Sequence, residues 1–382
     1  MLFEPIIGQE KAKARLRQMA SGGRMPHALL LLGPSGSGKL ALAMAYAQYA
    51  LCPNRNGADA CGQCNSCTKA NKLVHPDIHY AYPTIGSKAT SEMFLPQWRD
   101  IINRSPYLNA NDWLQHIGAE NKQGNITKEE CVSIIRKLSL KTFEGSHKVL
   151  ILWLPEYLGK EGNRLLKLIE EPPEQTLFIL VAEQQELILN TILSRCQIVK
   201  IPALSDEEVQ HGLMQKGLSP EAAATAAYLA NGDFNEAQKL VEHRDQDDAQ
   251  LFLAWMRNGY QGKPVNLVQW SEAFAEKGRE TQKHFLLYAL HFLRELTLLK
   301  ATNGNARARL QEKELESARK MAAVLDLDQA EQLSHLFNDC IFAVERNANP
   351  KVLFLDASIK MHHILKRKSA EAYTGLPAKL LF

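Results

Sequence analysis

The sequence predicts an α/β domain with a parallel sheet and a phosphate-binding loop, followed by two helical domains. Three observations lead to this prediction. The apolar run ALLLL at residues 28–32 leads into the Gly-rich turn GPSGSGK at residues 33–39 and then into a small-residue helix. Two further apolar runs, residues 148–154 and 176–182, alternate with a helical segment, as in parallel sheets. After Pro202 the sequence predicts helices only.

Length and charge indicate how many domains the chain has and which classes of protein can be excluded. A chain of 382 residues exceeds what one hydrophobic core supports, so two or three domains are expected. The formal net charge is only +3, which argues against a nucleic-acid-coating protein and predicts that any DNA contact is local. The N-terminal residues lack the order of a secretory signal, and residues 28–32 are too few to span a bilayer. We therefore predict a cytoplasmic protein without a membrane segment.

The remaining elements follow in order along the chain. An amphipathic helix is predicted from about Ile6 to Ala20, ahead of the first strand. Residues 80–126 are polar and weakly periodic, so we expect an insertion or a mobile loop there. The segment GKEGNRLLKLIEE, residues 159–171, predicts a helix between the second and third apolar runs. Ser205 starts a capping-box pattern that begins a three-helix unit, and residues 247–367 are predicted to be helical throughout.

Four of the seven cysteines lie close together, in the spacing C-x8-C-x2-C-x2-C. In a reducing compartment such a cluster binds metal more often than it forms disulfides. Four thiolates with no open position are typical of a structural zinc site, and the alternative is four unligated thiols. His75 and Asp77 follow in the turn HPD, and we assign both a structural role because four cysteines already complete a tetrahedron. The predicted zinc ligands are Cys52, Cys61, Cys64 and Cys67.

The phosphate-loop pattern G-x-x-x-x-G-K-[ST] is intact except at its last position. In such a loop backbone N–H groups and the lysine hold phosphates, and the final hydroxyl holds magnesium. Leu40 stands in place of that hydroxyl, so the first protein ligand of the ion is missing. We predict a retained structural turn rather than a hydrolytic site, while the intact glycines and lysine leave nucleotide binding open. The residues assigned to the loop are Gly33, Gly36, Gly38 and Lys39.

The second metal ligand of such sites is also missing. It is normally an Asp at the end of a neighbouring strand, followed by a catalytic Glu. Here the strand at residues 148–154 ends in Trp153 and Leu154. Glu156 lies past the strand end and could act as the metal ligand only if the register of the strand were shifted. Such a shift is disfavoured, because a phosphate-loop site holds its groups to within about half an ångström.

Several motifs together resemble one family. IIGQ, GPSGSGK, the four-cysteine module, HPD, NRLLKLIEEPP and TILSRC occur in the order of the AAA+ clamp-loader subunits of bacterial DNA polymerase III. The resemblance covers roughly residues 1–240 and extends beyond them only in length and helicity. It implies an AAA+ P-loop domain at 1–202 with a zinc module at 52–67, a helical lid domain at 203–245 and a helical collar domain at 246–382 for oligomerisation.

Departures from the family pattern distinguish its two kinds of subunit. The motor subunit has the loop hydroxyl, an Asp-Glu strand end, a Thr or Ser at the end of the third apolar run and an Arg in the lid helix. Without these, this chain resembles the delta-prime subunit, for which no intrinsic ATPase activity is expected. The corresponding positions here read Leu40, Trp153 with Leu154, Ala182 with Glu183, and Asn235.

The motif Ser194-Arg195-Cys196 is intact. In the family its arginine acts on the nucleotide of the adjacent subunit, where a guanidinium stabilises charge on the transferring phosphoryl group. The alternative is an ordinary surface arginine. The implied partners are the motor subunits, the delta subunit, the sliding clamp and, through the assembly, primed DNA. Two rival functions stay open: the ATP-hydrolysing motor subunit itself, and a free-standing zinc-dependent DNA-binding or repair factor.

Overall fold

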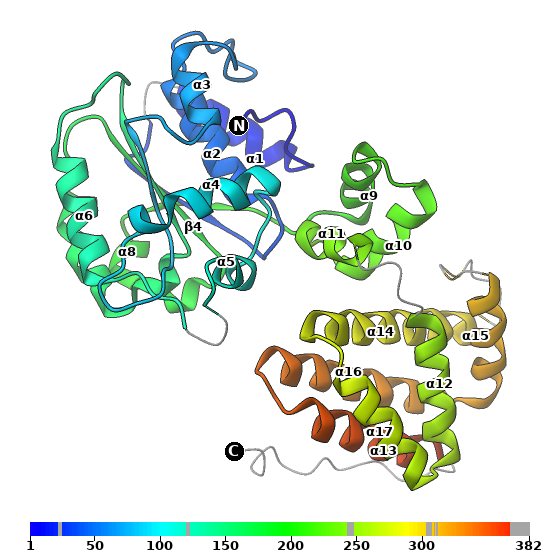
Figure 1. The fold of residues 1–382 in the computed structure, drawn as a ribbon. Helices are drawn as coiled ribbons and strands as arrows, with labels where there is room; N and C mark the ends of the chain where they lie inside the picture. Colours follow the sequence, from blue (N-terminus) through cyan, green and yellow to red (C-terminus); the bar gives the residue numbers. More distant parts are fainter. Residues whose placement is uncertain are drawn as a thin grey trace. The chain divides into compact units, whose positions relative to one another are not determined.

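The computed structural model describes residues 1–21, 25–119, 123–242, 248–302, 308, 310 and 312–366. The chain forms two compact units, Met1–Lys239 and Leu240–Phe382 (Figure 1). The first unit contains a parallel sheet, and the described part of the second is helical. The division into three domains stays a prediction, and its boundary at residues 245 and 246 lies outside the described residues.

The sheet has five strands, and each neighbouring pair is parallel. The three predicted apolar runs are its central strands. The two edge strands were not predicted, because each is only four residues long and adds little to the apolar pattern. In spatial order the strands are β2 (Ile78–Ala81), β3 (Lys148–Trp153), β4 (Thr176–Ala182), β1 (Ala28–Leu32) and β5 (Gln197–Lys200).

Helices cover both faces of the sheet. Side chains alternate along a strand, so Leu29 and Leu31 enter one hydrophobic core while Leu30 enters the other. Figure 1 shows α2 and α6 on opposite sides of the strands. The first layer contains α1 (Glu10–Ser21), α2 (Lys39–Leu51) and α3 (Asn65–Asn71), and the second contains α6 (Lys128–Ser139), η2 (Pro155–Leu165), α7 (Leu166–Glu170) and α8 (Asn190–Leu193).

Residues 80–126 are folded wherever the structure describes them, so of the two predicted alternatives, an insertion or a mobile loop, the mobile loop is wrong. Trp98 and Trp113 are fully buried in this segment. The Tyr82 ring stacks on Trp98 with centroids 4.1 Å apart, and the Trp98 and Trp153 centroids lie 5.3 Å apart. Burial of these large rings outweighs the polar composition. The segment forms η1 (Ser91–Phe94), α4 (Leu95–Arg104) and α5 (Ala110–His116).

Two helices differ from their predicted bounds. Helix α1 begins at Glu10 rather than near Ile6, because Gly8 and Gln9 have positive φ angles of 56° and 61°. The helix predicted at residues 159–171 is instead the 3₁₀ segment η2 followed by the short helix α7. Gly159, with φ 49° and ψ −132°, interrupts η2 and prevents a continuous α-helix.

Three helices follow the sheet, and the last of them crosses the end of the first unit at Lys239. Ser205 begins the first of them with the predicted capping box: its Oγ accepts from the Glu208 N–H at 3.2 Å, and the Glu208 carboxylate accepts from the Ser205 N–H at 2.9 Å. The helices are α9 (Asp206–Gln215), α10 (Pro220–Ala230) and α11 (Phe234–Glu242), which we call the α9–α11 segment.

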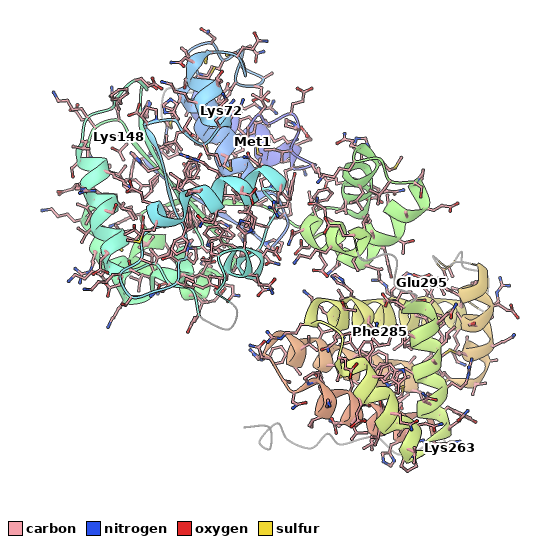
Figure 2. All side chains as sticks on the ribbon, viewed as in Figure 1. Met1, Lys72, Lys148, Lys263, Phe285 and Glu295 are labelled. Carbon is pink, nitrogen blue, oxygen red and sulfur yellow. The ribbon has the colours of Figure 1, made fainter. Side chains whose placement is uncertain are left out.

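The second unit packs its described helices around an aromatic core. Phe285, labelled in Figure 2, is fully buried there, and Trp255 lies parallel to Trp270 with ring centroids 4.9 Å apart. Across the described residues, no helix is long and apolar enough to cross a membrane. The helices are α12 (Asp248–Gln261), α13 (Pro264–Ala275), α14 (Arg279–Ala301), α15 (Glu312–Val324), α16 (Leu327–Glu345) and α17 (Pro350–Lys366).

His79 in β2 is expected to make the first unit sensitive to acid. Burial, with nearby Lys137, lowers the pKa of His79 to about 4, against about 6.5 in an unfolded chain. The unfolded chain therefore binds the extra proton first, and stability falls as pH drops from about 6.5 to 4. The effect on the free energy of unfolding is about 3 kcal/mol. Hydrogen exchange of the β3 and β4 amides, corrected for intrinsic rates, measures it.

The matched variants for this prediction are His79→Gln and His335→Gln. The His335 side chain is 78% exposed, so its replacement is expected to leave the wild-type pH dependence intact. His79→Gln is expected to flatten the dependence between pH 6.5 and 4. A His79→Gln protein with the wild-type slope would contradict the assignment.

Candidate functional site

The phosphate loop joins β1 to α2 at the carboxyl edge of the sheet. Gly36 and Gly38 have φ angles of 63° and 85°, a region that favours glycine. At Gly33 an added Cβ would lie 1.9 Å from the carbonyl oxygen of Ile201, directly after β5. The glycines are therefore required by the backbone, whether or not phosphate binds.

Lys39 is engaged by partners within the chain. Its side chain is 4% exposed, and its Nζ donates to the Pro34 carbonyl oxygen at 2.5 Å and pairs with Glu183 Oε1 at 3.4 Å. Burial lowers the pKa of Lys39, and the charge of Glu183 opposes that shift. Since Glu183 directly follows β4, the end of this strand supplies the lysine with a carboxylate.

Strand β3 ends in apolar residues rather than in an acid. Trp153 and Leu154 are buried in the apolar core, at 2% exposure each. Glu156 lies in η2, and its Oε1 accepts from the backbone N–H groups of Glu183 at 2.5 Å and Gln184 at 2.8 Å. Leu40, which stands in place of the hydroxyl, is buried as well. A cleft of about 710 Å³ runs along these strand ends, with Glu156 and Glu183 in its lining.

Gln9 holds the loop in place, and sequence reasoning assigned it no role. Its Nε2 donates to the Ser37 carbonyl oxygen at 3.1 Å and to the Pro202 carbonyl oxygen at 2.7 Å. The side chain thus ties the segment before α1 to the loop and to the end of β5. The motif IIGQ contains this residue, but no local pattern indicates its distant partners.

Arg195 lies between α8 and β5, with its Nε buried and the rest of its guanidinium partly exposed. The side chain is 31% exposed. Nη1 donates to the Thr191 carbonyl oxygen at 2.8 Å, and Nη2 pairs with Glu170 Oε2 at 3.1 Å. The Glu170 side chain is 56% exposed, so this is a surface ion pair worth at most about 1 kcal/mol. The guanidinium can therefore exchange this partner for another anion at little cost.

The four clustered cysteines converge on one point. Their sulfur atoms all lie within 4.8 Å of one another. Cys52 ends α2 and Cys64 begins α3, so the two helices fix the cluster. The backbone N–H groups of Gln63 and Cys64 lower the pKa of Cys61 to about 6, which favours the thiolate that a metal requires. Burial raises the pKa of Cys52 and Cys67. Four sulfur ligands without an open position suit a structural zinc ion.

Short N–H···S contacts pre-organise the cysteine cluster. The Cys61 N–H donates to Cys52 Sγ at 3.3 Å, and the Cys64 N–H donates to Cys61 Sγ at 3.4 Å. The Cys67 N–H donates in turn to Cys64 Sγ at 3.4 Å. These contacts orient the sulfur atoms toward one another and supply positive dipoles that stabilise negative thiolates.

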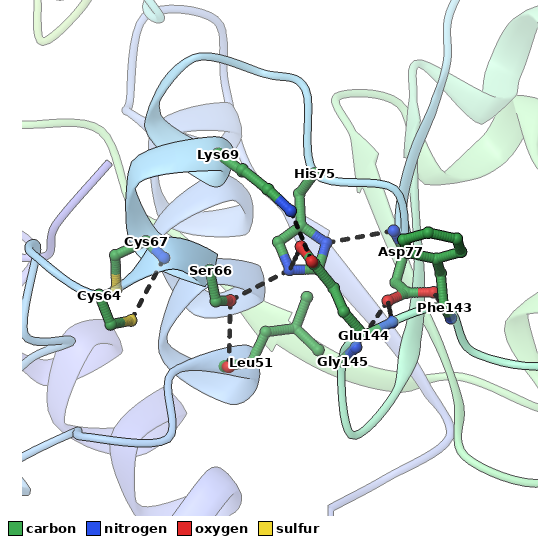
Figure 3. Close-up of polar contacts among 10 residues, drawn as sticks. All are labelled: Leu51, Cys64, Ser66, Cys67, Lys69, His75, Asp77, Phe143, Glu144 and Gly145. Carbon is green, nitrogen blue, oxygen red and sulfur yellow. Dashed lines mark hydrogen bonds and ion pairs between the residues drawn. The ribbon is translucent and has the colours of Figure 1, made fainter.

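His75 and Asp77 anchor the cysteine module to the sheet (Figure 3). His75 Nδ1 accepts from the Asp77 N–H at 3.1 Å, so Nε2 carries the proton, and it lies 3.1 Å from Ser66 Oγ on α3. The Asp77 carboxylate accepts from the backbone N–H groups of residues 143, 144 and 145 at 2.6, 2.9 and 2.7 Å. Neither side chain belongs to the cysteine cluster, in agreement with the structural role predicted for both.

A family model described as "DNA polymerase III, delta subunit" matches residues 8–205. This match covers more than half of the chain. The chain belongs to this family. The matched residues contain the phosphate loop, the four clustered cysteines and Arg195.

Similar curated proteins are named as two kinds of subunit. The chain is 26% identical over 229 residues to DNA polymerase III subunit delta' of Bacillus subtilis, covering 59% of this chain and 56% of that protein. It is 31% identical over 179 residues to subunit delta' of Yersinia pestis, covering 46% and 42%. It is 26% identical over 247 residues to subunit tau of Escherichia coli, covering 63% and 32%. The chain thus spans about half or less of the length of these relatives.

Solved structures align along most of the chain. A gamma subunit-related protein of Thermotoga maritima aligns over 93% of this chain and 99% of that chain, with a TM-score of 0.40 and 13% identity. This likeness is too low to bear on the fold, which follows from the sheet order above.

Proposed function

We propose that the chain is a non-hydrolysing clamp-loader subunit of the DNA polymerase III holoenzyme, of the delta-prime type. In this role Arg195 acts in trans on the nucleotide of a neighbouring ATPase subunit while the sliding clamp is loaded onto primed DNA. Membership of the family supports the clamp-loader part of the proposal. The observation that carries the delta-prime part is the contrast between Lys39, buried and paired with Glu183, and Arg195, whose side chain is 31% exposed and paired with an exposed acid.

The partners follow from this role. They are the motor subunits and the delta subunit, the sliding clamp, and primed DNA reached through the assembly. The net charge of +3 agrees with a DNA contact that is confined to the phosphate backbone and weak for the isolated chain. The four clustered cysteines would hold a structural zinc ion, and the chain would act in the cytoplasm.

The test of the proposal is ATP hydrolysis by the complex rebuilt with its motor and delta subunits. Loss of turnover at the neighbouring site with Arg195→Ala, in a complex that still assembles, supports the trans role. Unchanged turnover contradicts it.

Restoring the loop hydroxyl alone is not expected to create an ATPase. Leu40→Thr supplies one magnesium ligand, but Trp153 and Leu154 still offer neither the second ligand nor a catalytic acid. Lys39 also stays paired with Glu183. Phosphate release by the isolated chain with Mg-ATP and primed DNA is expected to stay at background.

The alternative to a non-hydrolysing subunit is the ATP-hydrolysing motor subunit, since similar proteins include gamma and tau subunits. Turnover by the wild-type chain that disappears in Lys39→Ala would support the motor function. Turnover that appears only in Leu40→Thr would show that another residue supplies the second metal ligand. Either result would contradict a non-hydrolysing subunit whose site lacks both ligands.

A further inference from the structure

The turn between α10 and α11 packs directly on the phosphate loop. The Phe234 N–H donates to the Gly36 carbonyl oxygen at 3.2 Å. A Cβ added to Gly36 would lie 1.8 Å from Asp233 Oδ1, so the carboxylate rests against the glycine with no room for a side chain. The turn at residues 233 and 234 therefore covers the phosphate loop at Gly36.

Asp233, which contacts Gly36, also caps the N-terminus of α11. Its Oδ1 accepts from the Glu236 N–H at 3.0 Å, as a residue that caps the start of α11 does. Burial raises the pKa of Asp233, and its negative charge acts on Lys39 together with those of Glu183 and Glu156. Glu183 thus contacts the one lysine that a nucleotide would need, and the charges of Asp233 and Glu156 act on it as well.

The α9–α11 segment has further anchors beside the loop. The Asp112 carboxylate of α5 accepts from Asn235 Nδ2 and is paired with the Lys239 ammonium. Asn235 occupies the position at which the resemblance expects the arginine of a motor subunit. The rings of Tyr107 and Phe234 meet edge to face with centroids 4.9 Å apart. Polar and aromatic contacts within the chain thus fasten the segment to the α/β core.

We propose that Glu183 and Asp233 act in place of a nucleotide. Glu183 neutralises Lys39, and Asp233 fixes the start of α11 on the phosphate loop. The α9–α11 segment consequently stays docked on the α/β core when no nucleotide is present, and the loop rejects nucleoside phosphates. This inference rests on the proposed function in one respect, namely that the phosphate loop of this chain does not hydrolyse ATP.

The charges explain why a nucleotide is excluded. A diphosphate brings several negative charges to a loop where Lys39 already has a carboxylate partner. Like charges a few ångströms apart in a partly buried site repel strongly, because protein interiors screen them less than water does. A nucleotide would have to displace Glu183 from Lys39 and approach Asp233 as well.

Nucleotide binding by the full chain tests the proposal. The double variant Glu183→Gln with Asp233→Asn removes both charges but keeps side-chain shape, and asparagine still caps a helix. By isothermal titration calorimetry, the wild type is expected to show no saturable binding at about 1 mM MgADP. The double variant is expected to show saturable binding, with a Kd of about 0.1 mM or lower. Glu174→Gln, an exposed acid before β4, is the control and is expected to behave as wild type.

A second measurement reports the docking itself. In Gly36→Ala the new Cβ meets Asp233, and hydrogen exchange of residues 204–239 is expected to rise at least about tenfold while the β3 and β4 amides keep their protection. Unchanged exchange there would overturn the docking role. Tight MgADP binding by the wild type, or a double variant that binds no better, would overturn the exclusion role. Both measurements use the chain alone, so their failure is distinct from a failure of Arg195 to act in trans.

Discussion

Arg195→Ala is expected to slow ATP hydrolysis at the neighbouring subunit's site by about a thousandfold, the lower end of what an arginine finger contributes. Under the proposed function the guanidinium would stabilise charge on the transferring phosphoryl group. Water would replace it poorly, because the planar and permanently charged fork is lost. The cost of freeing it is small, since its present partner Glu170 is 56% exposed. Single-turnover phosphate release, with only the neighbouring site competent, measures the effect.

Two further variants make this result specific. Arg195→Lys keeps the charge but not the planar fork, so only a fraction of the rate is expected to return. Arg164→Ala removes another surface arginine, 44% exposed and paired with Glu161 at 2.6 Å, and is expected to leave the rate unchanged. Equal loss in the Arg195 and Arg164 variants, or a defect in assembly alone, would show that Arg195 has only a structural role.

The sequence predicted best those structural features that are formed by residues close together along the chain. The spacing C-x8-C-x2-C-x2-C places four thiols around one point, and the structure brings them within 4.8 Å. The continuous apolar runs at residues 28–32 and 148–153 are central strands because they are buried on both faces. The capping box at Ser205 was equally readable, since both of its partners lie within one turn.

The sequence was least informative where contacts join residues far apart. Lys39 meets Glu183 across 144 positions, and no local pattern indicates that the end of β4 would carry the acid that pairs with the loop lysine. Asp233 against Gly36 is a contact of the same kind. The polar composition of residues 80–126 gave no indication of the aromatic cluster in this segment. The residues that could have indicated it are Trp98 and Trp113, because both are large, apolar and fully buried. Long-range packing therefore decides the state of the phosphate loop.

Loss of zinc is expected to unfold the cysteine module while the α/β core persists. Structural zinc ions contribute folding free energy outright, and without one the buried sulfur atoms of Cys52 and Cys67 would converge with no partner charge. We expect about one tightly bound zinc per chain, lost in Cys64→Ser with Cys67→Ser. Hydrogen exchange of residues 53–76 is then expected to approach that of an unfolded chain, with a fall in Tm of about 5–10 °C.

The anchors of the module decide how far this unfolding spreads. Asp77 holds residues 143–145 through three backbone bonds that involve no cysteine, so the start of β3 is expected to stay protected after zinc is removed. Two links from α3 would be lost: the contact of the Ser66 hydroxyl with His75, and the ion pair of Lys69 with Glu144. Cys196→Ser, outside the cluster, is the control and should retain the metal. A metal-free preparation with residues 53–76 still protected would show that the four thiols pack without an ion.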